Sequence, residues 1–339
     1  MLDVLKERHF SEHYANGFLE TDISLPGALV DDIQHHYAAK AIGHNDFPKF
    51  FVKNEHLASV ESKALGMFFG AFPSVGTKMV KKLYDRAYEK AVYCDQTFVE
   101  KVLKQLMESG FQRLFQTRYI VAGYDMYLRN THRSPGAGIH SDLPNVHHFY
   151  ETENDLSLYI PLVDFDEGNG GRLSVLPESK LKMPGNVLLK LLYDYFSKKP
   201  ESLDADGYVD PAKVSGPALT AFIKSRPHQE LLALYRGVIG LAKTQYAGEF
   251  RKTVETRGKV LMFNNKNFHA AEDWKNERVA REVYVIRMFP VYDARIKLKR
   301  EIHGTLANNF LLDMKLGEVR RFEDAVDLGR LPNEEKLKL

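Results

Sequence analysis

The stretch LSLYIPLVDFDEGNGGRLSVLPESK, residues 156–180, contains two short apolar segments separated by a glycine-rich turn. These segments, 156–165 and 171–177, are rich in β-branched and aromatic residues and are bounded by Asp, Gly and Pro, a composition typical of β-strands. The glycines are turn residues and not a phosphate-binding loop, because no helix start follows them. This stretch therefore predicts that the chain is built around a β-sheet.

Three further segments share this character: RYIVAGYDMYL (118–128), GKVLMFN (258–264) and REVYVIRMFPV (281–291). Each is short, rich in Val, Ile, Tyr or Phe, and flanked by turn-forming residues. A chain of 339 residues with 44% hydrophobic residues can bury such strands in a large core. We therefore expect residues 118–291 to form a β-rich core.

The region that precedes this core, residues 1–117, is expected to be mainly helical and to pack on the core. Segments 78–92 and 97–110 place apolar residues at intervals of three and four, the period of an amphipathic helix. Thr97 and Glu100 have the spacing of a capping box at the start of the second segment.

Between the segments at 171–177 and 258–264 lies a predicted insertion, at about 183–256. It contains two helical patterns, 186–199 and 228–243, and an insertion of this length is rarely an idle loop. It could serve as a lid over the core or as the interface of a homodimer, and the sequence does not choose between them. The tail, 292–339, alternates charges without strong periodicity, which predicts a peripheral helix or a solvated face that packs on the core.

The composition excludes several classes of partner. The chain has 47 basic and 45 acidic residues, a net charge of +2, and no basic stripe, which argues against a nucleic acid partner and leaves a small molecule as the expected substrate. No apolar run approaches the roughly 20 residues that span a bilayer, so the expected location is the cytoplasm. Cys94 is the only cysteine, so any metal must be bound by His, Asp or Glu.

The segment GAGIHSDLPN, residues 136–145, carries a candidate metal site. In an extended chain, residues i and i+2 project to the same side, so His140 and Asp142 can present an imidazole and a carboxylate to one ion. A third ligand is available in His269, which directly follows a predicted strand. Taken alone, this pair of residues is weak evidence, because a chain with 13 histidines can produce it by chance, and a solvated loop is the simpler interpretation.

Two histidines and one carboxylate on one face of an octahedron leave three positions open. This arrangement suits a ferrous ion that binds a bidentate oxoacid together with O2, whereas a closed structural zinc site needs no such vacancy. The order of the predicted elements adds weight to the metal interpretation, because a strand follows each of the two ligand-bearing segments.

Segments 156–180 and 258–269 together resemble the phytanoyl-CoA-dioxygenase-type branch of the iron(II)/2-oxoglutarate-dependent oxygenases. The likeness lies in an acidic-Asn-Gly turn before a strand that ends in Pro-x-Ser, and in a strand that leads into a histidine. It covers roughly 118–180 and 256–291. It implies a double-stranded β-helix, the cupin-like jelly roll of two facing sheets, and leaves the N-terminal helices, the insertion and the tail unmatched. Together with the helices expected from periodicity, this gives a mainly β fold with flanking helices and a helical insertion. It also implies Fe(II), 2-oxoglutarate and O2 as the groups that the site binds.

The same resemblance implies individual roles. His140, Asp142 and His269 match the metal ligands of the family, and Arg281 matches the arginine that binds the distal carboxylate of 2-oxoglutarate. A guanidinium suits this task because it offers a rigid two-pronged donor whose charge persists at all relevant pH. Arg278 and Arg287 are rivals, and Arg287 shares Arg281's side of an ideal strand.

One departure from the family pattern affects the cosubstrate. The family places a Ser or Thr shortly after the distal histidine, but here Ala270 and Ala271 follow it. The missing hydrogen bond must come from elsewhere, and Tyr127 and Tyr159 are the candidates, since each lies on a strand expected to line the barrel.

The function that the resemblance implies is that of a non-haem iron 2-oxoglutarate-dependent dioxygenase, which hydroxylates an unactivated C–H bond of a small metabolite such as an amino acid or a natural-product intermediate. Halogenating relatives lack the carboxylate ligand, so Asp142 favours hydroxylation over chlorination. Desaturation, cyclisation and epimerisation use the same site and stay open. The alternatives are a cupin-like metal enzyme that does not use 2-oxoglutarate and a catalytically silent binding protein.

Overall fold

The structure is a computed structural model. It describes residues 4–41, 91–93, 95, 97–132, 138–142, 156–183, 187–203, 205, 209, 213–290, 301–302, 305–306 and 309–322. Most of the predicted helix at 78–92, and the histidines at 147 and 148, lie outside these residues.

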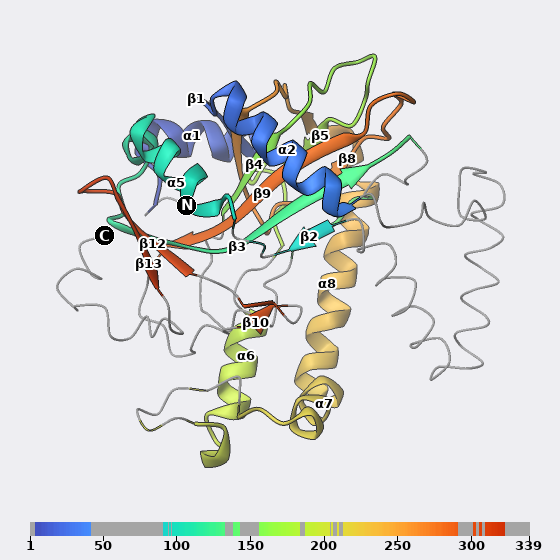
Figure 1. Ribbon diagram of the computed structural model, residues 1–339. Coiled ribbons are helices and arrows are strands. Elements are labelled where there is room, and N and C mark those ends of the chain that lie inside the picture. The colour runs from blue at the N-terminus through green and yellow to red at the C-terminus, as the bar shows by residue number, and fades with distance from the viewer. Residues whose placement is uncertain are drawn as a thin grey trace.

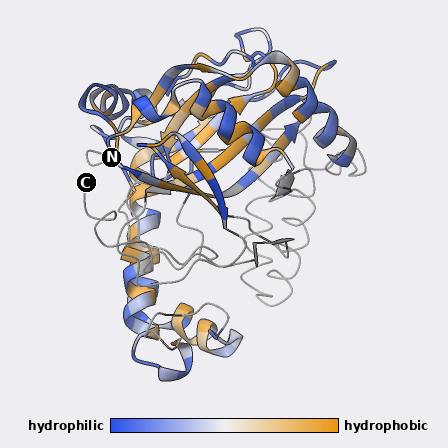
Figure 2. Cartoon of the chain, turned by 60° about the vertical axis from the view of Figure 1, so that its left-hand side comes forward, coloured by the Kyte–Doolittle hydropathy of each residue, from blue (hydrophilic) through white to orange (hydrophobic). Residues whose placement is uncertain are grey.

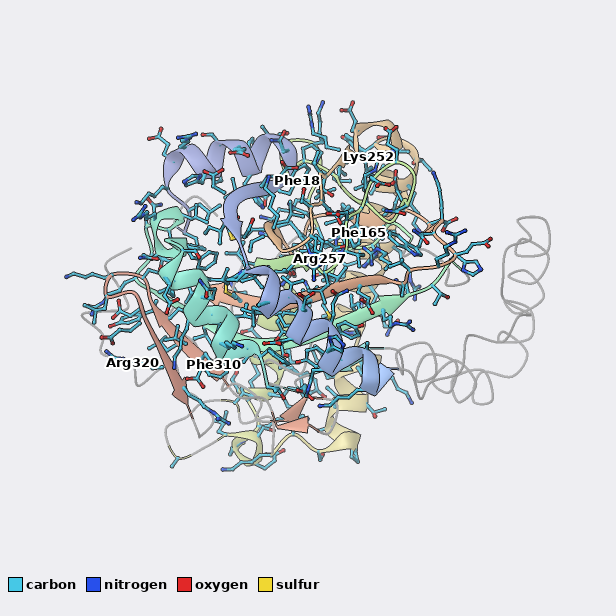
Figure 3. The ribbon with its side chains drawn as sticks, turned by 45° about the horizontal axis from the view of Figure 1, so that its top comes forward. Phe18, Phe165, Lys252, Arg257, Phe310 and Arg320 are labelled. Carbon is cyan, nitrogen blue, oxygen red and sulfur yellow. The ribbon has the colours of Figure 1, made fainter. Side chains whose placement is uncertain are left out.

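The larger of the two main sheets has eight strands, all antiparallel to their neighbours. Along the sheet the strands are β1 (Phe18–Ser24), β7 (Lys259–Asn264), β4 (Leu156–Pro161), β9 (Arg281–Pro290), β3 (Tyr119–Asn130), β12 (Asn309–Asp313) and β13 (Glu318–Phe322), and β2 (Ala91–Tyr93) also pairs with β3. Phe18 lies on β1 at one edge and Phe310 on β12 toward the other (Figure 3).

The smaller sheet contains β6 (Arg251–Lys252), β5 (Leu173–Val175) and β8 (His269–Ala271), in that order. A bridge between His140 and His269 adds the segment before Asp142 to its edge. Along the chain, β3, β4, β7 and β9 belong to the large sheet, whereas the His140 segment, β5, β6 and β8 belong to the small one. This alternation is the double-stranded β-helix, or jelly roll, so the predicted fold class is confirmed.

The two faces of the large sheet have different neighbours. Side chains such as Tyr159, Val283 and Val285 face the small sheet and pack with Leu173 and Val175. Side chains of the other face pack against α2 (Gly27–Ala41) and α5 (Val99–Glu108), which lie over the sheet in Figure 1, beside α1 (Glu7–Asn16). Each large apolar side chain buried there stabilises the fold by roughly 1.5–3 kcal/mol, so the helices hold the large sheet in place.

Helix α5 confirms the predicted helical pattern at 97–110. Its buried residues follow the three- and four-residue spacing: Val99, Val102, Leu103, Leu106 and Met107. The predicted capping box is wrong, because Phe98 occupies the N-cap and no side chain caps the helix. The Thr97 hydroxyl donates instead to Asp95.

Among the described residues between β5 and β6 there are three α-helices: α6 (Val187–Phe196), α7 (Gly216–Lys224) and α8 (Arg226–Thr244). The first and third confirm the predicted helical patterns, and α7 was not predicted. They extend away from the sheets in Figure 1, and Figure 2 shows hydrophobic and hydrophilic residues alternating along them. Their apolar residues pack with Phe268, next to β8. Their role as a lid or as a dimer interface stays a prediction.

Two expectations about the ends of the chain need correction. The N-terminal region is not only helical, because β1 pairs with β7 and extends the large sheet. The described part of the tail forms strands and no helix: β12 pairs with β3, β13 pairs with β12, and β10 (Glu301–Ile302) pairs with β11 (Thr305–Leu306). Among the described residues, no helix combines the length and hydrophobicity needed to cross a bilayer.

Candidate metal centre

His140, Asp142 and His269 come together at the edge of the small sheet. One potential ligand atom of each lies within 4.8 Å of the others. His140 Nε2 lies 3.7 Å from Asp142 Oδ1, and His269 Nε2 lies 3.5 Å from Asp142 Oδ2. The backbones of the two histidines are joined by reciprocal N–H···O hydrogen bonds of 3.0 and 2.8 Å. Strand pairing therefore fixes the distance between residues that are far apart in the sequence.

The other ring nitrogen of each histidine is held by a backbone carbonyl. His140 Nδ1 lies 2.6 Å from the oxygen of Gly138, and His269 Nδ1 lies 2.9 Å from that of Asn267. Because a carbonyl oxygen can only accept, Nδ1 must carry the proton in both rings. In the neutral imidazoles both Nε2 lone pairs are then free and directed toward Asp142, which is how metal-binding histidines are oriented.

The surroundings of His269 and Asp142 keep these two residues in the states that a metal requires. Burial lowers the pKa of His269 to about 4, which Asp142 only partly opposes, so its imidazole is neutral at neutral pH. Burial alone would raise the pKa of Asp142, but the positive charge of Arg287 and its hydrogen bond to the carboxylate lower it below its ordinary value. The carboxylate is therefore ionised and able to bind a cation.

Arg287 lies directly behind the carboxylate. Its Nη2 donates to Asp142 Oδ2 at 2.5 Å, and its Nη1 donates to the Ser157 hydroxyl and to the side-chain oxygen of Asn265. Sequence reasoning did not find Ser157 and Asn265, which have no distinctive spacing. Together the three side chains fix one oxygen of Asp142 and leave its other oxygen facing His140.

Arg281 is buried between the two sheets. Its Nε donates to the backbone oxygen of Gly171 at 2.9 Å, its Nη2 donates to the Tyr159 hydroxyl, and its guanidinium carbon lies 4.9 Å from the centre of the Phe165 ring. Figure 3 labels Phe165 together with Phe18. Arg281 and Arg287 face the same side of β9, as their even spacing predicts, whereas Arg278 is exposed in the preceding turn.

Tyr127 lies on the opposite face of the large sheet, which contradicts the expectation that it lines the barrel. It pairs in register with Tyr284, packs with the helix-covered core, and stacks on Tyr37 of α2 with ring centres 5.1 Å apart. Its hydroxyl donates to Glu282 at 2.7 Å. Of the two candidate tyrosines, only Tyr159 shares a face with Arg281.

No family model matches the chain, and no curated protein matches it. Several solved structures do. The non-haem α-ketoglutarate-dependent carbocyclase SnoK from nogalamycin biosynthesis is 11% identical with a TM-score of 0.47, and the match covers 88% of each chain. EctD from S. alaskensis is 10% identical with a TM-score of 0.46, over 89% of this chain and 84% of that one.

A third similar structure is HygX from Streptomyces hygroscopicus with nickel and 2-oxoglutarate bound. It is 10% identical with a TM-score of 0.41, over 86% of this chain and 89% of that one. At these identities and scores the matches carry no argument about function. The jelly-roll topology and the three converging side chains are the observations from which the function is inferred.

Proposed function

We propose that the chain is an Fe(II)/2-oxoglutarate-dependent oxygenase in which His140, Asp142 and His269 bind the metal. One observation carries the proposal: two imidazoles, each with Nδ1 held by a carbonyl, direct Nε2 toward the two oxygens of one carboxylate. If the contact with Asp142 served only to stabilise the fold, one imidazole would be enough and the second would have no purpose. Three ligands of this kind on one side of an ion leave the other side free for exchangeable ligands.

The donor set fits ferrous iron. Two imidazole nitrogens and one carboxylate oxygen are the ligands of the facial triad, and thiolates, which would favour zinc or an iron–sulfur cluster, are absent from the three residues. The single negative charge of Asp142 leaves an Fe(II) site with a net charge of about +1, which the chelating carboxylate of a dianionic oxoacid can neutralise. When bound, iron, 2-oxoglutarate and O2 supply the oxidising chemistry, with 2-oxoglutarate converted to succinate and CO2.

We assign the distal carboxylate of 2-oxoglutarate to Arg281 and Tyr159. The guanidinium and the hydroxyl face the interior between the sheets, where the low dielectric strengthens a charge-assisted hydrogen bond. Phe165 and Trp274 cover this region and keep water from competing for the arginine. A cupin-like metal enzyme that does not use an oxoacid has no need for a buried guanidinium here, so Arg281 argues against that alternative.

The proposed reaction is hydroxylation of an unactivated C–H bond in a small molecule. The carboxylate ligand Asp142 supports hydroxylation over halogenation, because it occupies the position that a halide would need. Within the proposal, an amino acid or a natural-product intermediate is the substrate class, and desaturation, cyclisation and epimerisation stay open as alternative outcomes.

Anaerobic addition of Fe(II) and 2-oxoglutarate tests the proposal, because the chelate has a weak visible charge-transfer band. We expect this band in the wild-type protein, its loss in His269→Ala, and a greatly weakened affinity for 2-oxoglutarate in Arg281→Ala. Tyr127→Phe, on the other face of the sheet, is the control and should keep the band. A wild-type protein that binds no Fe(II) would indicate a silent binding protein, and one that binds Fe(II) but forms no chelate would indicate the cupin-like alternative.

A further inference from the structure

Glu255 is a buried carboxyl group close to the proposed cosubstrate site, and the oxygenase assignment gives it no role. It follows β6 and is 3% exposed. Its Oε1 accepts hydrogen bonds from the backbone N–H of Leu173, at 2.6 Å, and from the Thr253 hydroxyl. Its Oε2 is buried and has no hydrogen-bond partner among the described residues. Leaving a buried polar atom unpaired costs roughly 1–3 kcal/mol, which calls for an explanation.

Arg281 and Tyr159 are the groups that face this carboxyl from the large sheet. The charge of Arg281 acts to lower the pKa of Glu255, the Glu255 carboxyl in turn acts to raise the pKa of the Tyr159 hydroxyl, and Arg281 is itself only 4% exposed. Within the described part of the chain, no carboxylate lies within 4.0 Å of the Arg281 guanidinium, although the partly buried Arg118 and Arg287 each have such a partner. Glu255 and Arg281 therefore interact through charge, while the hydrogen bonds of Arg281 go to Gly171 and Tyr159.

The other ionisable groups near Glu255 are Glu272, Glu20 and Lys259. Glu272 accepts from Arg172 at 3.0 Å and from Lys252 at 2.6 Å. Glu20 on β1 and Lys259 on β7 line a narrow gap that also borders Glu255. Burial raises the pKa of Glu255 to about 7, an effect that Arg281 opposes and Glu272 adds to. Near neutral pH the carboxyl therefore populates both its charged and its neutral forms.

We propose that Glu255 completes the pocket for the distal carboxylate of 2-oxoglutarate, and that it takes up a proton when this anion binds. The inference rests on the proposed function. In the empty site the ionised carboxyl balances Arg281. When the cosubstrate carboxylate arrives, two anions would share one guanidinium in a low-dielectric interior, which is unfavourable. Protonation converts Glu255 into a donor, and its unpaired Oε2 then supplies the hydrogen bond that Ala270 and Ala271 do not.

The sign of the pH dependence follows from this coupling. Because the bound anion raises the pKa of Glu255, the complex holds more protons than the free protein, and the affinity for 2-oxoglutarate falls as pH rises. Below the pKa of the free protein the acid is already neutral and the affinity is level. Above it the dissociation constant rises by up to about tenfold per pH unit, until the pKa of the complex is passed.

Anaerobic calorimetry of the Fe(II)-loaded protein tests the proposal directly. Titration with 2-oxoglutarate at pH 7.5, in two buffers of different ionisation enthalpy, gives the number of protons taken up, and loading the metal first prevents its ligands from contributing. We expect net uptake by the wild-type protein and none by Glu255→Gln, which keeps the acceptor for Leu173 and a donor toward the site. At pH 8 the variant should bind 2-oxoglutarate several-fold more tightly than wild type.

Glu272→Gln is the matched control, since this carboxyl is nearby but paired with Arg172, and it should keep the proton uptake. Equal enthalpies in both buffers for the wild-type protein, or the same pH slope in wild type and Glu255→Gln, would overturn the inference. In either case the charge-transfer band of the wild-type chelate would still be present. Its absence is the separate sign that the oxygenase assignment itself has failed.

Discussion

Arg287 donates a hydrogen bond of 2.5 Å to the carboxylate of Asp142, although 145 positions separate the two residues. The guanidinium is itself fixed by Ser157 and Asn265, so it cannot rotate freely. Asp142 lies outside the named strands, and Arg287 of β9 thus determines the direction in which its carboxylate points. In the proposed metal site, Arg287 orients a ligand rather than binding the distal end of the cosubstrate.

Arg287→Lys tests this orienting role. It keeps the positive charge, so the repulsion between this side chain and Fe(II) is nearly unchanged, but it loses the planar fork that reaches Asp142 and Ser157 together. We expect Fe(II) affinity, measured by competition with a chromophoric chelator, to fall about tenfold or more. Arg257→Lys is the control, because Arg257 also donates several hydrogen bonds, but to Leu162 and Gln34 and to none of the three candidate ligands. Equal losses in the two variants would refute an orienting role.

The two tyrosines form a matched pair. Tyr159→Phe removes the hydroxyl that accepts from Arg281, and the affinity for 2-oxoglutarate should fall roughly 10- to 100-fold, as expected for a hydrogen bond to a charged group. Tyr127→Phe should leave that affinity unchanged and lower the free energy of unfolding by roughly 1–3 kcal/mol, because Glu282 loses a donor in the core. Chemical denaturation and the charge-transfer titration measure both quantities. If Tyr127→Phe lost affinity for 2-oxoglutarate and Tyr159→Phe kept it, the cosubstrate would bind on the face of the large sheet opposite to the one proposed.

Gly171 allows Arg281 to approach the glycine-rich turn. Its φ is 75°, and an added Cβ would lie 2.7 Å from the Trp274 ring and 3.0 Å from Arg281 Cδ. Gly171→Ala should therefore lower stability by roughly 1–3 kcal/mol and weaken 2-oxoglutarate binding. Gly237→Ala in α8, where nothing lies within 4 Å, should instead stabilise by up to about 1 kcal/mol. Thermal melts measure the change in stability, and titration with 2-oxoglutarate measures the change in affinity. Unchanged affinity for 2-oxoglutarate in Gly171→Ala would show that Arg281 tolerates displacement.

Because His13 is buried, we expect the free energy of unfolding to fall at acid pH. This histidine is fully buried in α1, and burial lowers its pKa from an ordinary value of 6.5 to about 4, against the opposing charge of Glu178. The unfolded chain therefore binds the proton first, and stability present above pH 6.5 is lost as the pH falls toward 4, by roughly 3 kcal/mol. In His13→Gln this part of the loss should disappear, whereas exposed His35→Gln should keep it. Urea unfolding at pH 7 and pH 4.5 measures the difference, and parallel slopes in all three proteins would contradict it.

The strands predicted from sequence were those with the strongest apolar character. Every residue of β4 is buried, and the apolar run in 156–165 reveals it directly. Strand β1 was missed because its sequence, FLETDIS, carries acidic residues among the apolar ones. Strands β6 and β8 are two and three residues long, too short to form a pattern. The tail was misjudged because β13, EVRRF, alternates charges at an edge of the sheet.

The residues of the candidate site differ in how visible they are in sequence. His140 and Asp142 follow from a two-residue spacing, and the shared side of Arg281 and Arg287 follows from strand parity. The choice between Tyr127 and Tyr159 cannot be made from parity. Which face of the sheet a side chain occupies depends on the register of its strand with a neighbour, and the register of β3 shifts between Ala122 and Tyr124. Glu255 lies in a polar loop, and only the folded chain shows that its carboxyl is buried.

The helices α6, α7 and α8 leave the small sheet after Val175 and return to it at Arg251, and these two residues are paired neighbours. Because departure and return are tied together, the intervening segment can be lengthened, shortened or exchanged during evolution without breaking the pairing of β5 with β6, provided that its apolar contacts with Phe268 are kept. Descendants of such a protein can diversify in what they recognise while inheriting one unaltered candidate metal centre.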